Sequence, residues 1–101
     1  MADKIIVYWR DIPAQVIVKK GRKSAKRELT VRFSEAIDMA AMRSGAAGTD
    51  EYLAEWRRGE PEAVSDDLEA EAEQAANALE LEWPQDKLVE IAKIGGRLPD
   101  D

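Results

Sequence analysis

The sequence predicts a single α+β domain, in which a small antiparallel sheet of about three N-terminal strands is covered by three or four C-terminal helices. Two observations predict this class. Short β-branched, aromatic or alternating apolar segments lie before residue 34, and apolar residues at helical spacing follow it. A chain of 101 residues is long enough for one hydrophobic core and little more. We therefore expect one domain over residues 1–96 and a disordered tail over residues 97–101.

Three strands are expected before residue 34. Residues 4–9 (KIIVYW) are β-branched and aromatic, and residues 15–19 (QVIVK) have the same character. Residues 10–13 (RDIP) separate them as a turn, because proline fixes its own φ and favours an extended residue before it. We expect the two strands to pair as an antiparallel hairpin. Residues 28–33 (ELTVRF) alternate between apolar and polar side chains, which predicts a half-solvated third strand.

Helices are expected in the rest of the chain. They are predicted from Ser34 to Gly45, from Thr49 to Gly59, from Ser65 to about residue 82, and from Pro84 to Gly95. Serine and threonine are good N-caps, and glycine readily adopts the left-handed conformation that ends a helix. The longest of these helices carries a narrow stripe of leucine and alanine that suits close packing on a sheet or on another helix.

The composition excludes several kinds of active site. The sequence contains no cysteine and no histidine, so it offers no thiolate nucleophile, no cysteine-based zinc or iron–sulfur site, and no imidazole base. Its serines have no histidine to activate them, and its carboxylates match no calcium-binding motif. Lysine or carboxylate side chains could still act in catalysis with a shifted pKa, but no spacing in the sequence points to such a site. We therefore expect no enzymatic activity, no catalytic residues, no metal site and no cofactor. The longest apolar run near the N-terminus, residues 5–9, is too short for a membrane span, so we expect a cytoplasmic protein.

Charge is distributed unevenly along the chain. Residues 1–33 contain nine Lys/Arg and three Asp/Glu, whereas residues 34–101 contain six Lys/Arg and eighteen Asp/Glu, which gives a net charge of −6. The acidic total argues against a broad nucleic-acid interface, because the overall field repels a phosphate backbone. The positive charge is concentrated in residues 19–27 (KKGRKSAKR), which we call the basic segment.

The basic segment is the first candidate for a binding site. Its candidate partner- or anion-binding side chains are Lys20, Arg22, Lys23, Lys26 and Arg27. Arginine offers a planar fork of donors, and the glycine beside it permits close approach of an anion, although no phosphate-loop motif is present. The alternative is a solubilising loop between edge strands, where lysine discourages pairing with other chains. The residues alone favour this alternative.

The turn between the first two strands is the second candidate. Arg10, Asp11 and Gln15 present a guanidinium, a carboxylate and an amide, which a generic hairpin turn does not need. The alternative is that Arg10 and Asp11 pair with each other or cap the hairpin. The sequence does not separate these two interpretations.

Two further positions have alternative interpretations. Trp56, Arg57 and Arg58 form a possible interface, since aromatic residues and arginine are enriched at interfaces. At this spacing on a short helix, the aromatic residues are more often part of the core. Asp38 interrupts an apolar run and is expected to point to solvent, because an unpaired buried carboxylate is costly.

Four segments together resemble the bacterial virulence factor domain, a small family also found joined to other domains in conserved virulence factor proteins. The segments are YWRDIPAQV (8–16), GRKSAKREL (21–29), RFSEAIDMAAM (32–42) and YLAEWRRG (52–59). The resemblance covers residues 4–60, and the acidic helical end is less distinctive. Members joined to an iron–sulfur scaffold-type domain and helical repeats imply an accessory or assembly role. Stand-alone members lie near methyl-transfer and folate genes.

The resemblance brings no catalytic residues to carry over, so it supports a binding role. We expect an accessory module that binds a protein partner through the basic segment and the turn at residues 10–15. One alternative is a binder of an anionic ligand or nucleic acid that uses the same segment. Another is an accessory subunit of an enzyme of methyl or one-carbon metabolism. Neither the oligomeric state nor the strand order follows from the sequence.

Overall fold

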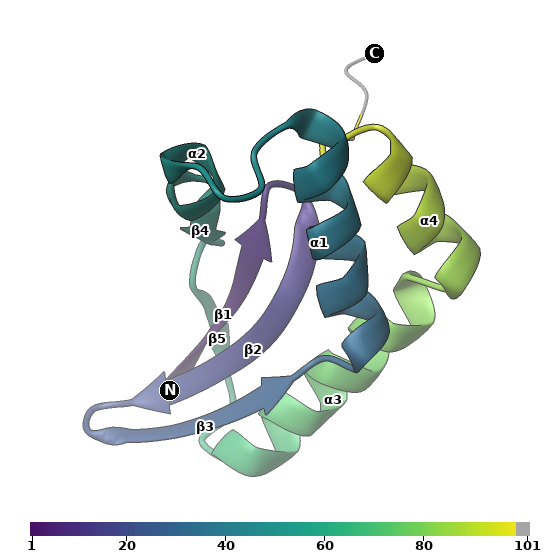
Figure 1. Cartoon of the computed structure of the whole chain (residues 1–101). Helices are drawn as coiled ribbons and strands as arrows, with labels where there is room; N and C mark the ends of the chain where they lie inside the picture. Colours follow the sequence, from purple (N-terminus) through teal and green to yellow (C-terminus); the bar gives the residue numbers. More distant parts are fainter. Residues whose placement is uncertain (99–101) are drawn as a thin grey trace.

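The computed structural model describes residues 1–98 and contains a five-stranded antiparallel sheet with helices packed against it (Figure 1). The elements are β1 (Ala2–Trp9), β2 (Ile12–Lys20), β3 (Lys23–Glu28), α1 (Val31–Ser44), α2 (Asp50–Ala54), β4 (Trp56–Arg58), β5 (Glu62–Val64), α3 (Leu68–Glu82) and α4 (Gln85–Lys93). The strand order is β3–β2–β1–β4, and β5 also pairs with β1. The α+β class and the N-terminal antiparallel sheet are confirmed, although the third strand lies at residues 23–28 and two short strands, β4 and β5, were not expected.

The predicted β1–β2 hairpin is confirmed, and its turn is unusual. The turn is shorter than predicted, because Ile12, Pro13 and the residues after them belong to β2. Trp9 pairs with Ile12, which leaves Arg10 and Asp11 as the turn residues, and Arg10 has a positive φ of 54°. A non-glycine residue in this conformation is uncommon and persists where surrounding contacts hold it. A β-bulge lies between Val7 and Tyr8 in the same ladder. The turn therefore depends on the rest of the molecule.

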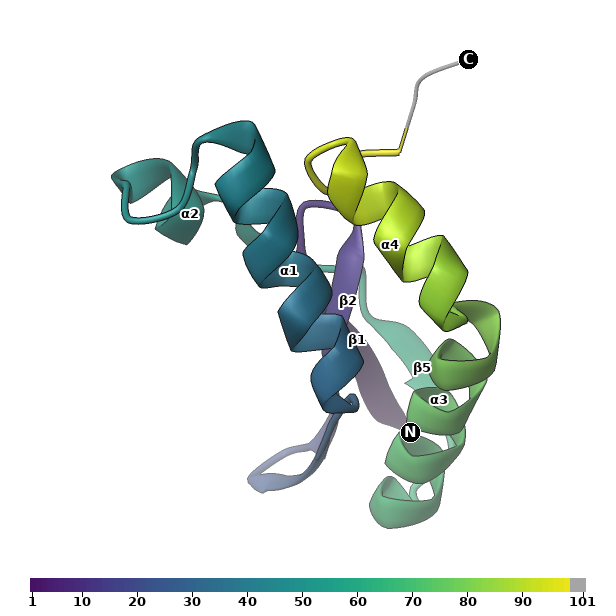
Figure 2. The ribbon, with the colours of Figure 1, turned by 45° about the vertical axis from the view of Figure 1, so that its right-hand side comes forward.

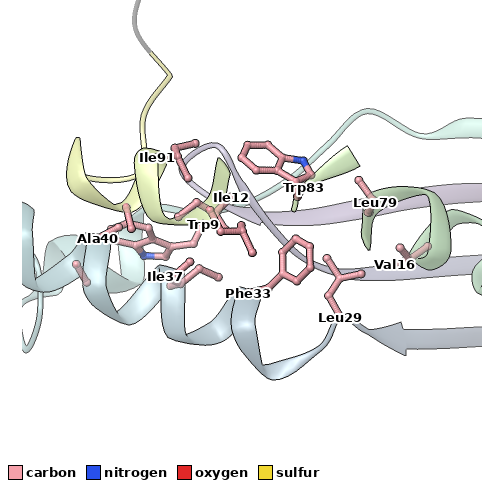
Figure 3. Close-up of a cluster of buried hydrophobic side chains, with 14 of the residues drawn as sticks. Trp9, Ile12, Val16, Leu29, Phe33, Ile37, Ala40, Leu79, Trp83 and Ile91 are labelled. Carbon is pink, nitrogen blue, oxygen red and sulfur yellow. The ribbon is translucent and has the colours of Figure 1, made fainter. Parts of the chain in front are cut away.

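The helices enclose one core between them and the sheet. Helix α3 packs on β2 and β3, whereas α1 packs on β2 and lies beside α4 (Figure 2). Figure 3 shows how the side chains meet: Trp9 lies beside Ala40 of α1, and Phe33 lies beside Leu29. Trp9 and Phe33 are almost fully buried, and burying a side chain of this size contributes roughly 2–3 kcal/mol to stability. Within residues 1–98, no helix has the length and apolar character needed to cross a bilayer.

The predicted third strand at residues 28–33 is wrong, because β3 ends at Glu28 and α1 begins at Val31. Leu29 and Phe33 are buried as the alternation predicts, but Val31 is 67% exposed. The predicted N-cap of this helix, Ser34, lies inside α1 and donates its hydroxyl to the carbonyl of Val31. The basic segment is therefore not a loop: it forms the end of β2, a tight turn and β3.

Helix α1 begins early because α1 and α3 cap each other. The carboxylate of Glu80 accepts hydrogen bonds from the backbone N–H of Thr30, at 2.7 Å, and from its hydroxyl, at 2.9 Å. A negative charge at this position complements the positive end of the α1 dipole. In return, Arg32 donates to the backbone carbonyls of Glu80 and Trp83 at the C-terminal end of α3. These contacts select helix where the alternation of residues 28–33 predicts strand.

The predicted helix over residues 49–58 is only partly confirmed, since α2 ends at Ala54 and residues 56–58 form β4. The edge of β1 offers free backbone groups, and the N–H of Gly59 donates to the carbonyl of Ile6 at 2.8 Å. A Cβ on Gly59 would lie 3.0 Å from the ring of Tyr8 and 3.2 Å from the Ile6 carbonyl. This glycine therefore permits close approach to the sheet and does not end a helix.

The two C-terminal helices agree with prediction. Helix α3 begins at Leu68, with Asp67 as its N-cap accepting from the N–H of Ala70, so the helix starts slightly later than expected. Helix α4 follows Pro84, and the chain then turns at Gly95 and Gly96. Of the predicted disordered tail, residues 97 and 98 contact the domain, and residues 99–101 lie outside the described residues.

Candidate functional site

Alternation along β2 and β3 sorts the basic segment onto two faces of the sheet. Val18 and Ala25 belong to the core cluster, so they mark the face that the helices cover. Lys20 and Arg27 each lie two residues further along their strands and therefore share this face. The opposite face, which we call the open face, carries Lys19 and Lys26.

Two cations on the covered face, Lys20 and Arg27, have partners within the protein, whereas Lys23, which lies opposite Lys20 on the same face, forms no ion pair within residues 1–98. Lys20 Nζ lies 2.7 Å from a carboxylate oxygen of Asp66, and Arg27 Nη2 lies 2.5 Å from Glu69. The hydrogen bond from Lys20 holds the pKa of Asp66 below its ordinary value of 3.8, and the ammonium of Met1 adds to this effect. The N-terminal end of α3 and the residues before it thus neutralise these two cations.

The remaining cations of the hairpin have no such partner. We call Lys19, Arg22, Lys23 and Lys26 the cationic tip. All four are exposed, and none forms an ion pair within residues 1–98. The β2–β3 turn that carries them lies at the far end of the sheet from α2 and α4 (Figures 1 and 2). The tip is therefore available to a partner.

The two charged residues of the predicted turn site are engaged within the protein. Arg10 is 7% exposed and donates to the carbonyl of Gly95 at 2.8 Å and to Glu51 at 3.0 Å. Its guanidinium also lies 4.8 Å from the Trp9 ring centroid. Asp11 accepts from the backbone N–H of Leu98 at 2.6 Å. These contacts join the turn to α2 and to the residues after α4, and Arg10 and Asp11 form no pair with each other in residues 1–98.

The predicted interface at residues 56–58 contains one side chain that is held within the fold and two that are not. Arg57 donates to the backbone carbonyl of Arg10 and to Asp11, and it stacks on the ring of Tyr8. Trp56 is 37% exposed and meets Tyr52 edge to face, with 6.2 Å between ring centroids. Arg58 is exposed and forms no ion pair within the described part of the chain. All three side chains are exposed, and Arg57, at 50%, is the one that hydrogen bonds also hold within the fold.

A groove lies beside the base of the β2–β3 hairpin. It has a volume of about 500 Å³ and is lined by Ala14, Gln15, Glu28, Leu29, Val31, Ser34, Ile37, Asp38, Tyr52 and Trp56. Asp38 points to solvent, as expected from the sequence. The sequence drew attention to Gln15, Asp38 and the aromatic residues Tyr52 and Trp56, but not to the groove that they share, because its lining residues come from distant parts of the chain. No cluster of side chains suited to holding a metal ion occurs among residues 1–98.

The fold and these two surfaces define a small α+β domain with a cationic hairpin tip and a separate groove lined by carboxylates and aromatic rings. The chain belongs to the virulence factor family, since the family model described as "Virulence factor" matches residues 7–92. The match confirms the predicted resemblance and extends it through α3 and most of α4. No curated protein and no solved structure matches the chain. The family description names no reaction and no ligand.

Proposed function

We propose that this chain is a non-catalytic cytoplasmic accessory module that binds an acidic surface of a protein partner through the cationic tip. The observation that carries the proposal is the contrast within one hairpin. Lys20 and Arg27 are neutralised by the protein's own carboxylates, whereas the four cations of the tip are exposed and without an ion pair in residues 1–98.

The arrangement of charge in the hairpin supports this proposal. Lys20 lies directly opposite Lys23 in the β2–β3 ladder. Like charges directly opposite each other destabilise a pair of strands, by roughly 0.2–1 kcal/mol. Lys20 has an internal partner and Lys23 has none in the described chain. The positive charge of the tip lowers the stability of the free hairpin, and an acidic group on a partner would neutralise it. This supports recognition of an external anionic group.

A protein partner is favoured over nucleic acid. The net charge of −6 repels a phosphate backbone at long range, while a local cationic patch still suits a compact acidic surface. Arg10 and Asp11 do not enter the proposal, because both are engaged within the fold.

The test compares two variants with equal charge change. Arg22→Glu/Lys26→Glu alters the tip, and Arg43→Glu/Lys93→Glu reverses two exposed cations on α1 and α4. Tagged wild type and the α1/α4 control should capture the same specific proteins from a lysate, and the tip variant should lose them. Circular dichroism should show equal folding. Capture of the same proteins by all three chains would contradict the proposal.

The same three chains also test the two alternatives, an enzyme of methyl or one-carbon metabolism as the partner and nucleic acid as the ligand. Capture of an enzyme of methyl or one-carbon metabolism, dependent on the tip, would identify the partner as such an enzyme. A salt-sensitive shift of labelled nucleic acid, lost in the tip variant, would favour nucleic acid instead. No shift at low salt removes that alternative.

A further inference from the structure

The groove beside the hairpin continues along α1. A second hollow of about 450 Å³ is lined by Met42, Ala47 and Gly48 and shares Asp38 and Tyr52 with the first. Together the two hollows follow α1 from Val31 to Met42, a distance of about 16 Å at the helical rise of 1.5 Å per residue. This length matches about five residues of extended chain at about 3.3 Å each. An open groove of this shape suits a peptide segment better than a compact small molecule.

Exposed apolar side chains border this groove. Val31 is 67% exposed and Met42 is 68% exposed, although both belong to a helix whose other face is in the core. Trp56 adds part of an indole ring. Exposed apolar groups gathered beside a hollow and rimmed by polar residues indicate an interaction site.

The aromatic wall of the groove is held in place from the core. The indole N–H of the buried Trp9 donates to the backbone carbonyl of Tyr52 at 2.8 Å, and the two rings lie 5.8 Å apart. Tyr52 in turn meets Trp56 edge to face. A preformed wall lowers the ordering cost of binding a ligand.

The charges in the groove define the polarity of its ligand. Glu28 and Asp38 contribute carboxylates, and neither forms an ion pair with any other residue of the described chain. No lysine or arginine lines either hollow. An apolar ligand alone would desolvate these carboxylates without compensation, which is unfavourable. A ligand with a cation beside apolar side chains satisfies both features.

We propose that the groove binds a short extended peptide segment of a partner, with a lysine or arginine flanked by apolar side chains. The basic side chain lies against Glu28 and Asp38, and the apolar side chains lie against Val31, Met42 and Trp56. The amide of Gln15 lines the groove and can donate to or accept from the peptide backbone, and the hydroxyl oxygen of Ser34, which donates its proton to Val31, can accept from it. This site is distinct from the cationic tip and has the opposite charge preference.

A random heptapeptide display library selected on the wild-type protein tests the proposal. Enriched peptides should carry lysine or arginine beside apolar residues. In fluorescence anisotropy, the enriched peptide should bind Glu28→Gln/Asp38→Asn at least about five-fold more weakly than wild type. The control Glu73→Gln/Glu82→Gln removes two exposed carboxylates of α3 and should bind like wild type. Arg22→Glu/Lys26→Glu should also keep peptide binding, which separates this site from the proposed function.

Several outcomes would overturn the proposal. These are the absence of enrichment, enrichment of acidic peptides, and equal binding to wild type and the groove variant. A dimer in light scattering that Trp56→Ala converts to monomer would show that a second copy covers the groove. Thermal melts establish that each variant remains folded.

Discussion

Replacing Glu80 by glutamine tests the mutual capping of α1 and α3. One carboxylate oxygen accepts from the Thr30 backbone N–H, and the other accepts from the Thr30 hydroxyl and from Arg32 at 2.7 Å. Glutamine keeps the size of the side chain but has only one acceptor oxygen, so its NH₂ group must face a donor. At least one hydrogen bond is lost, and the others lose the contribution of the negative charge.

The expected loss of stability is about 2 kcal/mol. Hydrogen bonds to a charged group contribute about 1.5–3 kcal/mol each when they are well buried. The side chains of Glu80 and Arg32 are 23% and 26% exposed, so water replaces part of what is lost. A total near 2 kcal/mol corresponds to a shift of about 1 M in the urea midpoint for a domain of this size.

The loss should depend on pH in a defined direction. Burial opposes ionisation of Glu80, but the hydrogen bonds from Thr30 and Arg32 outweigh it and hold the pKa below the ordinary 4.5. The ionised group therefore stabilises the fold fully above its unfolded pKa, and this stabilisation is lost as the pH falls through the lower folded pKa. The difference between wild type and Glu80→Gln should be full at pH 7 and shrink below pH 4.5.

Urea unfolding monitored by circular dichroism at pH 7 and at about pH 3 measures both effects. Glu73→Gln on the exposed side of α3 is the matched control and should change stability by less than about 0.5 kcal/mol. A loss at Glu80 no larger than that of the control, or a loss that stays constant with pH, would refute the capping argument.

Three further predictions follow from single contacts. Arg10→Ala should lower the free energy of unfolding by about 2 kcal/mol in urea, because it removes the bonds that hold the turn; a change under about 0.5 kcal/mol would contradict this role. Gly96→Ala should destabilise at least about 1 kcal/mol more than Gly48→Ala, and equal thermal melts would oppose this. Both glycines have positive φ, but only at Gly96 would a Cβ lie 3.0 Å from the Trp9 ring. Lys20→Met should raise the pKa of Asp66, measured by NMR titration, and an unchanged pKa would contradict the proposed pairing.

Local signals predicted the parts of the fold that depend on local chemistry. The hairpin of β1 and β2, the helix after Pro84 and the turn at Gly95 and Gly96 all follow from residue types within a few positions. The strand prediction for residues 28–33 was wrong because burial of Leu29 and Phe33 is compatible with a strand and with a helix. The contact that selects the helix comes from Glu80, about 50 residues away, and no local pattern contains it.

For the candidate sites, too, the sequence predicted local features, and the folded structure was needed for the contacts between distant residues. The basic segment was visible as a run of charge, but only the strand register separates Lys19 and Lys26 from Lys20 and Arg27. Arg10 was predicted as a partner- or anion-binding residue, and its contact with the C-terminal end of the chain could not be predicted without the folded structure. The groove could not be predicted, because it forms where β2, β3, α1 and the α2–β4 segment meet.

Because the chain is made from its N-terminus, the capping contacts between α1 and α3 can form only after α3 has been synthesised. The first turn of α1 emerges from the ribosome well before residues 80–83, so its final anchoring must wait until α3 has been made. Until then the nascent hairpin lacks its covering layer and depends on its lysines for protection from misassembly. The contacts that cap α1 therefore form only after 50 further residues have been added.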